Sequence, residues 1–504
     1  MENDSDIFII GGGINGTAIA ADAAGRGLSV SLCEKNDLAS GTSSASSKLI
    51  HGGLRYLEFY EFGLVRSALR EREILLGRAA HLISPLEFVL PYEKHLRSRW
   101  LVRLGLFFYD HLAKRNYLPA SSGLKFKNDH RGTALSPALK TGFSYFDCFA
   151  DDARLVIANA LLAKNKGAEI LTRTIFLSAK REKTAWKIAL QDAETKKNFY
   201  RQAKTLINVS GPWVKAVHAN ISPSDLTFDI ELDKGSHIVV PKLYEGNFAY
   251  VLQNRDQRIA FVIPFLGKYS LIGTTDSKFF ANLDTVKIAE IEEEYLCKAI
   301  NYYFKNPITK QNILWSYSGV RCLQASHETR TANITRDYQL LIENKSDLPL
   351  LTVIGGKLTT HRVLAEATLK KLGPYFPKMG GSWTANQPLP GGDFPKNDFS
   401  YFLTQFKQAF SWLPDEIATR YAKNYGTRVN ILLTGVNNLS DLGDHIAHGL
   451  YQKELEYLIH YEWAKTAEDV LWRRTKLGML FSAEEIEKLE RYILTTFQNA
   501  KLSS

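Results

Sequence analysis

The first forty residues of this chain constrain its fold more than any other stretch. A short apolar run at 6–10 is typical of a buried parallel strand, and a glycine-rich turn at 11–16 follows it directly. Small residues then predict a helix over 17–24, and a second apolar strand at 28–32 ends just before Glu34. This order predicts a βαβ unit.

The turn has the spacing G-x-G-x-x-G, with glycines at Gly11, Gly13 and Gly16. These glycines permit a tight turn, close approach of a pyrophosphate and close packing of the helix on the sheet. The helix N-terminus offers N–H groups to phosphates, and Glu34 stands where an acid accepts a hydrogen bond from a ribose hydroxyl. The motif also occurs without a ligand, but here its flanking strands and the acid indicate a dinucleotide site. The acid disfavours a 2′-phosphate, so FAD or NAD is expected rather than NADP.

Length and charge leave several function classes open. The chain has 504 residues, enough for two or three domains, and a net charge of +10. That charge suits an anionic substrate or an anionic membrane surface, and a mildly basic soluble protein has it too. The basic residues are dispersed and no base-stacking module is visible, so no nucleic-acid partner is expected.

The four cysteines form no C-x-x-C pair, so neither a metal site nor a redox dithiol is predicted. Reduced cysteines are typical of a cytoplasmic protein. The acidic start leaves no room for a signal peptide, and no run approaches the roughly 18 apolar residues of a membrane-spanning helix.

Two helical patterns precede residue 120. Residues 60–80 are amphipathic, whereas residues 100–113 are apolar nearly all round, with Arg103, Asp110 and Lys114 in one narrow polar stripe. A short aromatic helix with basic ends can lie in a bilayer surface, and a helix buried between domains has the same pattern. On the first interpretation, the residues that face lipid are Trp100, Leu101, Leu104, Phe107 and Phe108.

The remaining chain divides into three parts. Residues 225–320 alternate as strands do, interrupted by one helix at 287–304, and predict an inserted sheet. An apolar strand at 350–354 then leads into a helix whose N-terminus suits the electron-rich edge of a flavin. Past residue 388 the patterns at 415–423, 454–465 and 483–498 predict a helical C-terminal domain.

One loop is far more specific than the glycine turn. Residues 42–58 read T-S-S-A-S-S-K-L-I-H-G-G-L-R-Y-L-E, and with the glycine turn they closely resemble the FAD-dependent glycerol-3-phosphate dehydrogenases, above all the bacterial aerobic, quinone-linked type. The resemblance covers essentially the whole chain, through segments 151–155, 234–241, 272–276, 317–321, 355–360 and 469–476. Ser210, Cys322 and His361 depart from the usual Thr, Pro and Tyr, and none of these changes removes a predicted catalytic group.

The resemblance implies an α/β fold, α+β overall, with a Rossmann-like FAD-binding domain, an inserted antiparallel β-sheet as substrate or cap domain, and a helical C-terminal domain. The expected boundaries are 1–60, 145–225 and 320–386 for the FAD-binding domain, 61–144 and 226–319 for the cap domain with its membrane-facing helix, and 387–504 for the C-terminal domain.

FAD is the implied cofactor. The residues expected to bind it are Gly11, Gly12, Gly13, Asn15, Gly16, Glu34, Thr42, Ser43, Ser44, Ser46, Ser47, Lys48, Leu49, Gly52, Gly53, Ser210, Gly211, Trp213, Gly356, Lys357, Leu358 and Thr359.

Cations in the matched segments predict a phosphate clamp, because arginine grips phosphate bidentately and lysine acts as a point charge. The expected substrate-binding residues are Arg55, Tyr56, Arg321, Arg336, Lys357 and Thr360.

His237 and His51 are the candidates for the catalytic base, with Arg321 beside them. Nearby Lys and Arg charges lower an imidazole's pKa and keep the ring neutral, as a base requires. His237 lies in the matched part of the inserted sheet, whereas His51 lies in the cofactor loop. For either residue, a structural role is the alternative.

The implied reaction is oxidation of sn-glycerol 3-phosphate to dihydroxyacetone phosphate, with hydride transfer to FAD and electrons passed to a membrane quinone. Expected partners are this substrate, quinone, inner-face membrane lipid and a second copy of the chain in a homodimer. The expected location is cytoplasmic and peripheral on the membrane. The alternatives are an oxidase that uses oxygen, an FAD-linked amino-acid oxidase with about one arginine as carboxylate clamp, and a non-catalytic flavin-binding protein of the membrane surface.

Overall fold

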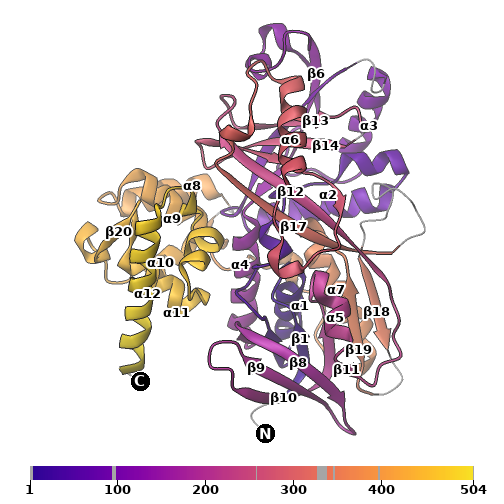
Figure 1. The fold of residues 1–504 in the computed structure, drawn as a ribbon, viewed down its shortest axis with the longest axis vertical. Helices are drawn as coiled ribbons and strands as arrows, with labels where there is room; N and C mark the ends of the chain where they lie inside the picture. Colours follow the sequence, from indigo (N-terminus) through magenta and orange to yellow (C-terminus); the bar gives the residue numbers. More distant parts are fainter. Residues whose placement is uncertain are drawn as a thin grey trace.

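The computed structural model describes residues 4–93, 98–256, 258–325, 338–343, 347–395 and 398–502, with side chains to residue 496. Two large sheets form the body, and a helical C-terminal part packs against its side (Figure 1). The N-terminal strand lies in the lower sheet in this view, and the sheet above it carries the helix that the sequence placed near lipid.

The first sheet holds the βαβ unit. Its central strands run parallel in the order β10-β1-β2-β7, and β19 pairs with β10 on the other side. Its strands are β1 (Asp4–Ile10), β2 (Val30–Cys33), β7 (Glu169–Leu171), β8 (Thr174–Arg181), β9 (Trp186–Asp192), β10 (Asn198–Asn208), β11 (Ile221–Ser222), β18 (Gln339–Glu343) and β19 (Leu350–Ile354).

Strand β1 is continuously apolar from Ile7 to Ile10 because both faces of this sheet are covered there. Ile7 and Ile9 pack into the cluster that contains the helices of the βαβ side. Phe8 and Ile10 point the other way and pack with Trp186 and its neighbours on β9. The covering helices are α1 (Ile14–Gly25), α4 (Asp152–Asn165) and α7 (His361–Leu372), and a short α5 (Val214–His218) follows β10.

The second sheet is the inserted one. Its path runs β16-β12-β15-β14-β13-β4-β6-β3, with β17 on β12 and β5 on β6. Its strands are β3 (Leu49–Ile50), β4 (Ile83–Pro91), β5 (Ser122–Lys125), β6 (Thr141–Ala150), β12 (Ile230–Pro241), β13 (Phe248–Gln253), β14 (Ile259–Phe265), β15 (Tyr269–Gly273), β16 (Ser277–Lys278) and β17 (Trp315–Gln324).

This sheet differs from the expected cap in two respects. It is mixed rather than purely antiparallel, because β13 and β4 run parallel. It also takes in β3, residues 145–150 of β6 and the end of β17, which the expected boundaries placed in the FAD-binding domain. Long antiparallel ladders cause the second difference: β6 pairs with β4 along its whole length, and β17 pairs with β12 from 315 to 324.

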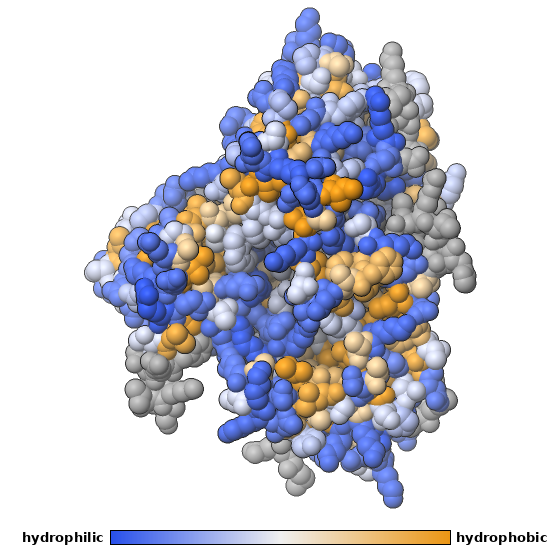
Figure 2. Space-filling model, in the orientation of Figure 1, coloured by the Kyte–Doolittle hydropathy of each residue, from blue (hydrophilic) through white to orange (hydrophobic). Residues whose placement is uncertain are grey.

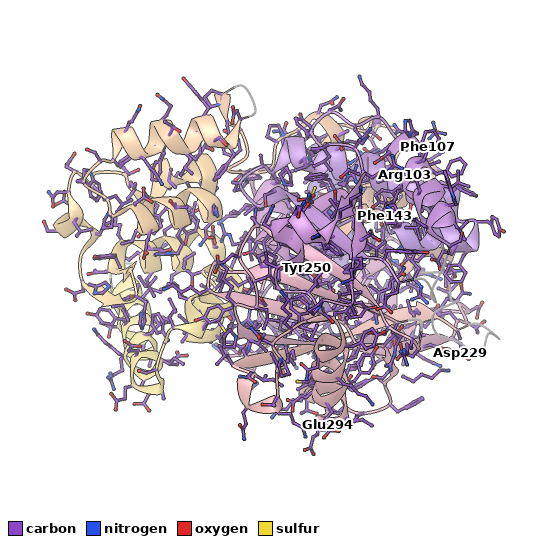
Figure 3. The ribbon with its side chains drawn as sticks, turned by 90° about the horizontal axis from the view of Figure 1, so that it is seen from above. Arg103, Phe107, Phe143, Asp229, Tyr250 and Glu294 are labelled. Atoms are coloured by element: carbon purple, nitrogen blue, oxygen red, sulfur yellow. The ribbon has the colours of Figure 1, made fainter. Side chains whose placement is uncertain are left out.

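Three helices flank the second sheet: α2 (Phe62–Arg78), α3 (Arg99–His111) and α6 (Glu290–Tyr303). The helical patterns at 60–80, 100–113 and 287–304 are thus confirmed to within a few residues. Helix α3 buries Leu106, Tyr109 and Asp110 and leaves the opposite face to solvent, where Trp100 is 85% exposed. Figure 3 shows Phe107 at the outer edge of the molecule, on the side away from the helical C-terminal part. In the described chain, no helix has the length and hydropathy needed to cross a membrane.

The C-terminal part contains α8 (Phe399–Ala409), α9 (Asp415–Tyr425), α10 (Val429–Leu432), α11 (Gln452–Glu462), a π-helical segment (Asp469–Arg474) and α12 (Ala483–Leu502). A small hairpin, β20 (His445–Ala447) with β21 (Leu450–Tyr451), adds to the helices. Buried ion pairs join this part to the first sheet. Arg473 and Arg474 both bind Asp37, and Arg154 of α4 binds Glu462.

Candidate active site

A cavity of about 1300 Å³ lies between the two sheets. One wall is the edge of the first sheet where β1 and β19 end, and the other is formed by β12 and β17 of the second sheet. Figure 2 shows a hollow on this face, between the helical part at left and the body, with hydrophilic residues along much of its rim. The cavity lies beyond the carboxyl ends of the parallel strands, which is where ligands bind in open α/β sheets.

Glycine shapes the first wall. Gly11 leaves β1 with φ +120°, a conformation that L side chains rarely adopt. A Cβ at Gly16 would stand 1.9 Å from the carbonyl oxygen of Gly11. Gly13 is the N-cap of α1, so the first N–H groups of that helix face the cavity edge. Gly356 has φ +104°, and a Cβ at this position would stand 2.8 Å from Nδ2 of Asn15.

The acid that ends the motif is tied to this turn. Glu34 accepts hydrogen bonds from Gly12 N (2.8 Å) and Asn36 N (3.0 Å), and burial raises the pKa of Glu34 above its usual value. Asn15 donates to Gly355 O at 3.2 Å, while its Oδ1 is buried with no hydrogen-bond partner among the described residues. A glycine cradle with an orphaned buried amide oxygen fits a dinucleotide.

The serine-rich loop is rigidly held rather than flexible. Ser43 Oγ accepts from Ile14 N at 3.0 Å, which joins the loop to the start of α1. Lys48 is buried and binds Asp152 at 2.8 Å, and Ser46 donates to the same carboxylate. Burial opposes ionisation of Asp152, but Lys48 outweighs it and holds the pKa of this carboxyl below its usual value. The loop is therefore fixed through a buried charge pair.

A row of cross-strand pairs forms the second wall. In the ladder of β12 and β17, His237 pairs with Tyr317, Gly235 with Gly319, and Asp233 with Arg321. These positions are two residues apart along each strand, so they share one face of the sheet. The glycine pair leaves a gap between an aromatic pair and an ionic pair.

His237 is the buried base candidate in this row. Its ring stacks on Tyr317 with centroids 4.8 Å apart, and its Nε2 lies 2.8 Å from Ser47 Oγ. Nδ1 is buried and has no partner among the described residues. Burial, reinforced by the charges of Lys48 and Arg321, lowers the pKa of His237 to about 3. The ring is therefore neutral at physiological pH.

Among the described residues, two of the expected cations, Arg321 and Lys357, line this end of the cavity. Arg321 binds Asp233 at 2.6 Å and Asp276 at 3.1 Å, so its charge is shared with two carboxylates. Lys357 lies over the ring of Tyr56, 3.9 Å from its centroid. Arg55 does not line the cavity and lies near Phe59 instead. Arg336 lies outside the described residues.

The cavity brings together most of the predicted site. Both histidine candidates line it, as do Tyr56, Arg321 and Lys357. The expected cofactor residues that line it are Gly11, Gly13, Asn15, Glu34, Thr42, Ser43, Ser44, Ser46, Ser47, Lys48, Leu49, Ser210, Gly211, Trp213, Gly356, Lys357, Leu358 and Thr359.

Besides Arg55, five expected residues do not line the cavity: Gly12, Gly16, Gly52, Gly53 and Thr360. Gly12 and Gly16 support the turn from behind, where a Cβ on either would strike Glu34 or Gly11. Gly52 and Gly53 pack away from the cavity, and a Cβ on Gly52 would meet Leu69 and the hydroxyl of Tyr109 within 2.7 Å. Thr360 is buried beneath the helix start.

The sequence analysis missed Tyr317 and Trp472, which line the cavity, and Asp233, which binds the lining residue Arg321. Asp233 and Tyr317 could have been found from the spacing of the two strand motifs, which place Asp, Gly, His and Tyr, Gly, Arg at alternate positions. Trp472 of the C-terminal part stacks on Trp315 with centroids 4.2 Å apart. That contact joins segments 157 residues apart, and no local pattern signals it.

Comparison with known proteins decides the family. Residues 6–362 match the model of the FAD-dependent oxidoreductases, and residues 382–499 match that of the C-terminal domain of alpha-glycerophosphate oxidase. The chain belongs to the FAD-dependent oxidoreductase family. The resemblance seen in the sequence is confirmed, and so is FAD as the cofactor that the glycine cradle fits.

Two relatives and one solved structure extend this result. A glycerol-3-phosphate dehydrogenase of Pseudomonas aeruginosa is 49% identical over 97% of this chain and 94% of its own length. A D-erythritol 1-phosphate dehydrogenase of Brucella abortus is 47% identical over 94% of each chain. The FAD-bound structure of glycerol-3-phosphate dehydrogenase from Bacillus halodurans superposes with a TM-score of 0.78 at 26% identity, covering 99% of this chain and 91% of that one.

Proposed function

We propose that this chain oxidises sn-glycerol 3-phosphate to dihydroxyacetone phosphate and delivers the electrons to a membrane quinone. The observation that carries the proposal is that one cavity joins the glycine turn at the start of α1 to the row bearing His237 and Arg321. The relative from Pseudomonas, whose name specifies glycerol 3-phosphate, supports the choice of substrate.

In this proposal the substrate phosphate binds between Arg321 and Lys357. Asp233 and Asp276 hold the Arg321 guanidinium in a fixed position, and Lys357 adds a second positive charge. Tyr56, beneath Lys357, restricts where that ammonium group can lie. A clamp of this kind would orient the C2 hydroxyl toward His237, and preorganised charges lose little entropy when they bind an anion.

His237 takes the hydroxyl proton at Nε2, next to the hydroxyl of Ser47. A pKa of about 3 leaves the ring neutral but makes it a weak base. A phosphate dianion beside Arg321 opposes the positive charges that depress this pKa, so substrate binding raises the basicity of the ring. When bound, FAD supplies the hydride acceptor that an unactivated alcohol requires.

The test is anaerobic spectrophotometry of the purified holoenzyme. Glycerol 3-phosphate should bleach the flavin absorbance, and Arg321→Ala should lower kcat/KM by roughly one to two powers of ten, the cost of a charge-assisted hydrogen bond. Weak activity on free glycerol, which has no phosphate, should hardly change. Equal losses on both substrates would show that Arg321 supports the fold or the flavin instead.

A four-carbon polyol phosphate is the second candidate substrate. The relative from Brucella has nearly the same identity to this chain, and its name specifies D-erythritol 1-phosphate. Bleaching rates with the two phosphates at equal concentration separate the candidates. Faster bleaching by erythritol 1-phosphate would replace glycerol 3-phosphate in the proposal and leave the clamp and the base in place.

An exposed aromatic face supports the membrane part of the proposal. Phe59, Tyr60 and Phe62 lie at the start of α2, and Phe62 contacts Phe108 of α3 with ring centroids 6.2 Å apart. Trp100, Leu101, Leu104, Phe107 and Phe108 are all at least 41% exposed. A contiguous patch of exposed apolar side chains marks an interaction site. The segment that carries Phe59 also carries Tyr56 of the cavity.

Vesicle pelleting tests this face. Phe107→Ser with Phe108→Ser should weaken binding to vesicles and quinone reduction while dye-linked turnover stays at the parental rate. Phe280→Ser with Ile291→Ser removes two apolar side chains elsewhere that are even more exposed, and it serves as the control. If the first variant pelleted with vesicles as well as the parent does, α3 would have a purely structural role.

A peripheral, cytoplasmic location and a homodimer complete the proposal and rest on the family resemblance alone. Light scattering of the purified holoenzyme tests the dimer, and a monomeric mass would remove it.

A further inference from the structure

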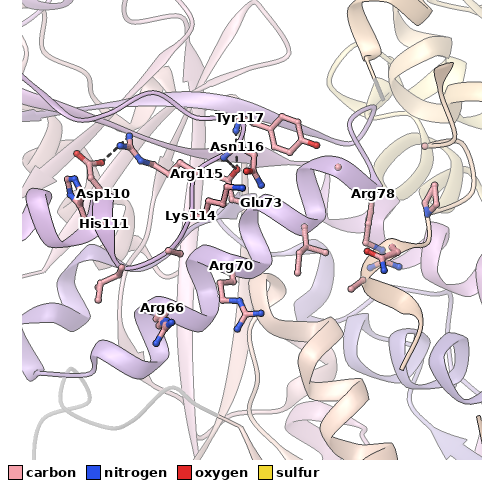
Figure 4. A pocket seen from close by; sticks show the side chains of 18 of the residues that line it. Arg66, Arg70, Glu73, Arg78, Asp110, His111, Lys114, Arg115, Asn116 and Tyr117 are labelled. Carbon is pink, nitrogen blue, oxygen red and sulfur yellow. Dashed lines mark hydrogen bonds and ion pairs between the residues drawn. The ribbon is translucent and has the colours of Figure 1, made fainter. Parts of the chain in front are cut away.

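A second large groove lies outside the cavity and beside the aromatic face. It has a volume of about 1040 Å³ and is bounded by α2, by the end of α3 with the residues after it, and by segment 385–394. Figure 4 shows Arg66 and Arg70 projecting from neighbouring turns of α2, with Lys114 and Arg115 on the segment opposite. Nothing in the proposed reaction uses this groove.

The groove has an excess of positive charge that its own acids do not neutralise. Arg66, Arg70 and Lys114 are exposed and make no ion pair with any residue that the structure describes. Arg78 is 3% exposed, donates from Nε to Gln387 O, and keeps a buried Nη1 without a partner in the described chain.

Two of the acids that line the groove, Glu73 and Asp110, accept several hydrogen bonds, and the third, Asp393, is exposed and accepts from Thr427 Oγ1. Glu73 accepts from the backbone N–H groups of Asn116 (2.8 Å) and Tyr117 (3.1 Å). Asp110 accepts from Ser121 N at 2.9 Å and Ser121 Oγ at 2.6 Å. These bonds fix the walls formed by α2 and by the end of α3, so an incoming anion meets arginine and lysine there, whereas Asp393 lies on segment 385–394.

The position of the groove relative to the aromatic face identifies the anion. Phe62 stands one helical turn before Arg66 on α2, and Arg70 follows one turn later. On α3, His111 stacks on Phe107 with centroids 4.2 Å apart and lies at the groove edge. The basic side chains therefore begin where the apolar face ends, which is the order of acyl chains and headgroups in a membrane.

We propose that this groove binds the phosphate of an anionic phospholipid headgroup, held by Arg66, Arg70 and Lys114 with Arg78 at its buried end. The inference rests on the proposed membrane association and adds to it a defined headgroup site. A soluble phosphorylated compound has the same phosphate chemistry, but it would gain nothing from the adjoining aromatic face.

The experiment measures partition of the holoenzyme onto vesicles of phosphatidylcholine alone and of an equimolar mixture with phosphatidylglycerol. Arg66→Gln with Arg70→Gln should lower partition onto the mixed vesicles by about thirtyfold and leave partition onto neutral vesicles almost unchanged. Dye-linked turnover should equal that of the parent, which shows that the variant is folded. The matched control is Lys183→Gln with Lys197→Gln, which makes the same charge change near β9, at the other end of the molecule in Figure 1.

The outcomes separate the proposals. Equal losses in the two double variants would mean that only overall charge matters, and the groove site would be overturned. A second pair of results would also overturn the groove site. Inorganic phosphate alone would raise the melting temperature of the parent but not of the Arg66/Arg70 variant, and the two proteins would bind vesicles equally. The site would then bind a free anion rather than a lipid headgroup. If the parent binds neither vesicle, the membrane association itself is wrong.

Discussion

The two walls of the cavity are built in opposite ways. The first sheet presents mainly backbone, through the turns at Gly11, Gly13 and Gly356, whereas the second presents side chains, above all His237 and Arg321. Parallel strands end in loops and helix starts, where N–H groups have no partner in the strand or helix. A broad strand ladder has its backbone groups paired and can offer only the side chains on one face. In the proposed reaction, the first wall would hold the cofactor and the second would supply the base.

This contrast predicts the largest effect for a side chain of the second wall. His237→Gln keeps an amide near Ser47 but removes the base, so the rate of flavin reduction by glycerol 3-phosphate should fall by about 10²- to 10⁴-fold. The FAD content should not change, because the first wall is untouched. Stopped-flow absorbance measures the rate. If the variant reduced its flavin at the parental rate, we would assign the role of base to His51 instead.

A buried lysine joins the two walls and gives the next largest effect. Lys48→Met leaves Asp152 as an uncompensated buried charge, so the free energy of unfolding should fall by about 3–5 kcal/mol. The matched control is Lys35→Met, which breaks an exposed ion pair with Asp284 and should cost about 0–1 kcal/mol. Urea unfolding of both holoenzyme variants measures the difference. Similar losses would show that Asp152 is satisfied by its other hydrogen bonds.

The contrast also explains how far the sequence could predict the site. The turn at Gly11–Gly16 is local, and its spacing alone indicates the dinucleotide edge, so α1, β1 and β2 lie within a few residues of the prediction. The serine-rich loop at 42–58 was also predicted, because its residues form one continuous segment of the sequence. Its anchoring through Asp152 was not predicted, because that partner lies 104 residues away from Lys48.

The second wall depends on pairing between distant strands, and a single sequence does not give strand register. The sequence analysis could name His237 and Arg321, yet it missed that Asp233 and Asp276 balance the arginine. It also placed Arg55 in a clamp whose cavity that side chain does not line. The domain boundaries missed β3 for a related reason, because it pairs with β6 about 100 residues further along the chain, and they divided β6 at residue 145. Roles for the individual site residues stay predictions.

A smaller effect should appear in the pH dependence of stability. The pKa of His237 is about 3 in the folded state and near 6.5 when the chain unfolds. Between these values the unfolded chain binds a proton that the folded chain does not, so stability falls as the pH drops below about 6.5. His237→Gln should remove about 1.4 kcal/mol per pH unit of this acid destabilisation. Unfolding at several pH values measures it, and parallel curves for parent and variant would contradict the buried, neutral ring.

The smallest effect tests whether the aromatic face is connected to the cavity. Tyr109 lies on the buried side of α3, donates to Asp147 and accepts from Gly52 N at 2.8 Å. Gly52 follows His51, so this hydroxyl links the helix that we place at the membrane to a residue lining the cavity.

Tyr109→Phe should cost about 1 kcal/mol of stability, since the Gly52 N–H keeps a second, longer contact with Asp147 at 3.4 Å. Tyr145→Phe is the matched control, because this buried ring packs on Tyr109 and its hydroxyl has no hydrogen bond to any described residue. If α3 positions the His51 loop, turnover with vesicle-bound quinone should fall several-fold in the Tyr109 variant and not in the control. A loss of stability without any change in turnover would show that the hydroxyl supports the fold alone, and that α3 does not position the His51 loop.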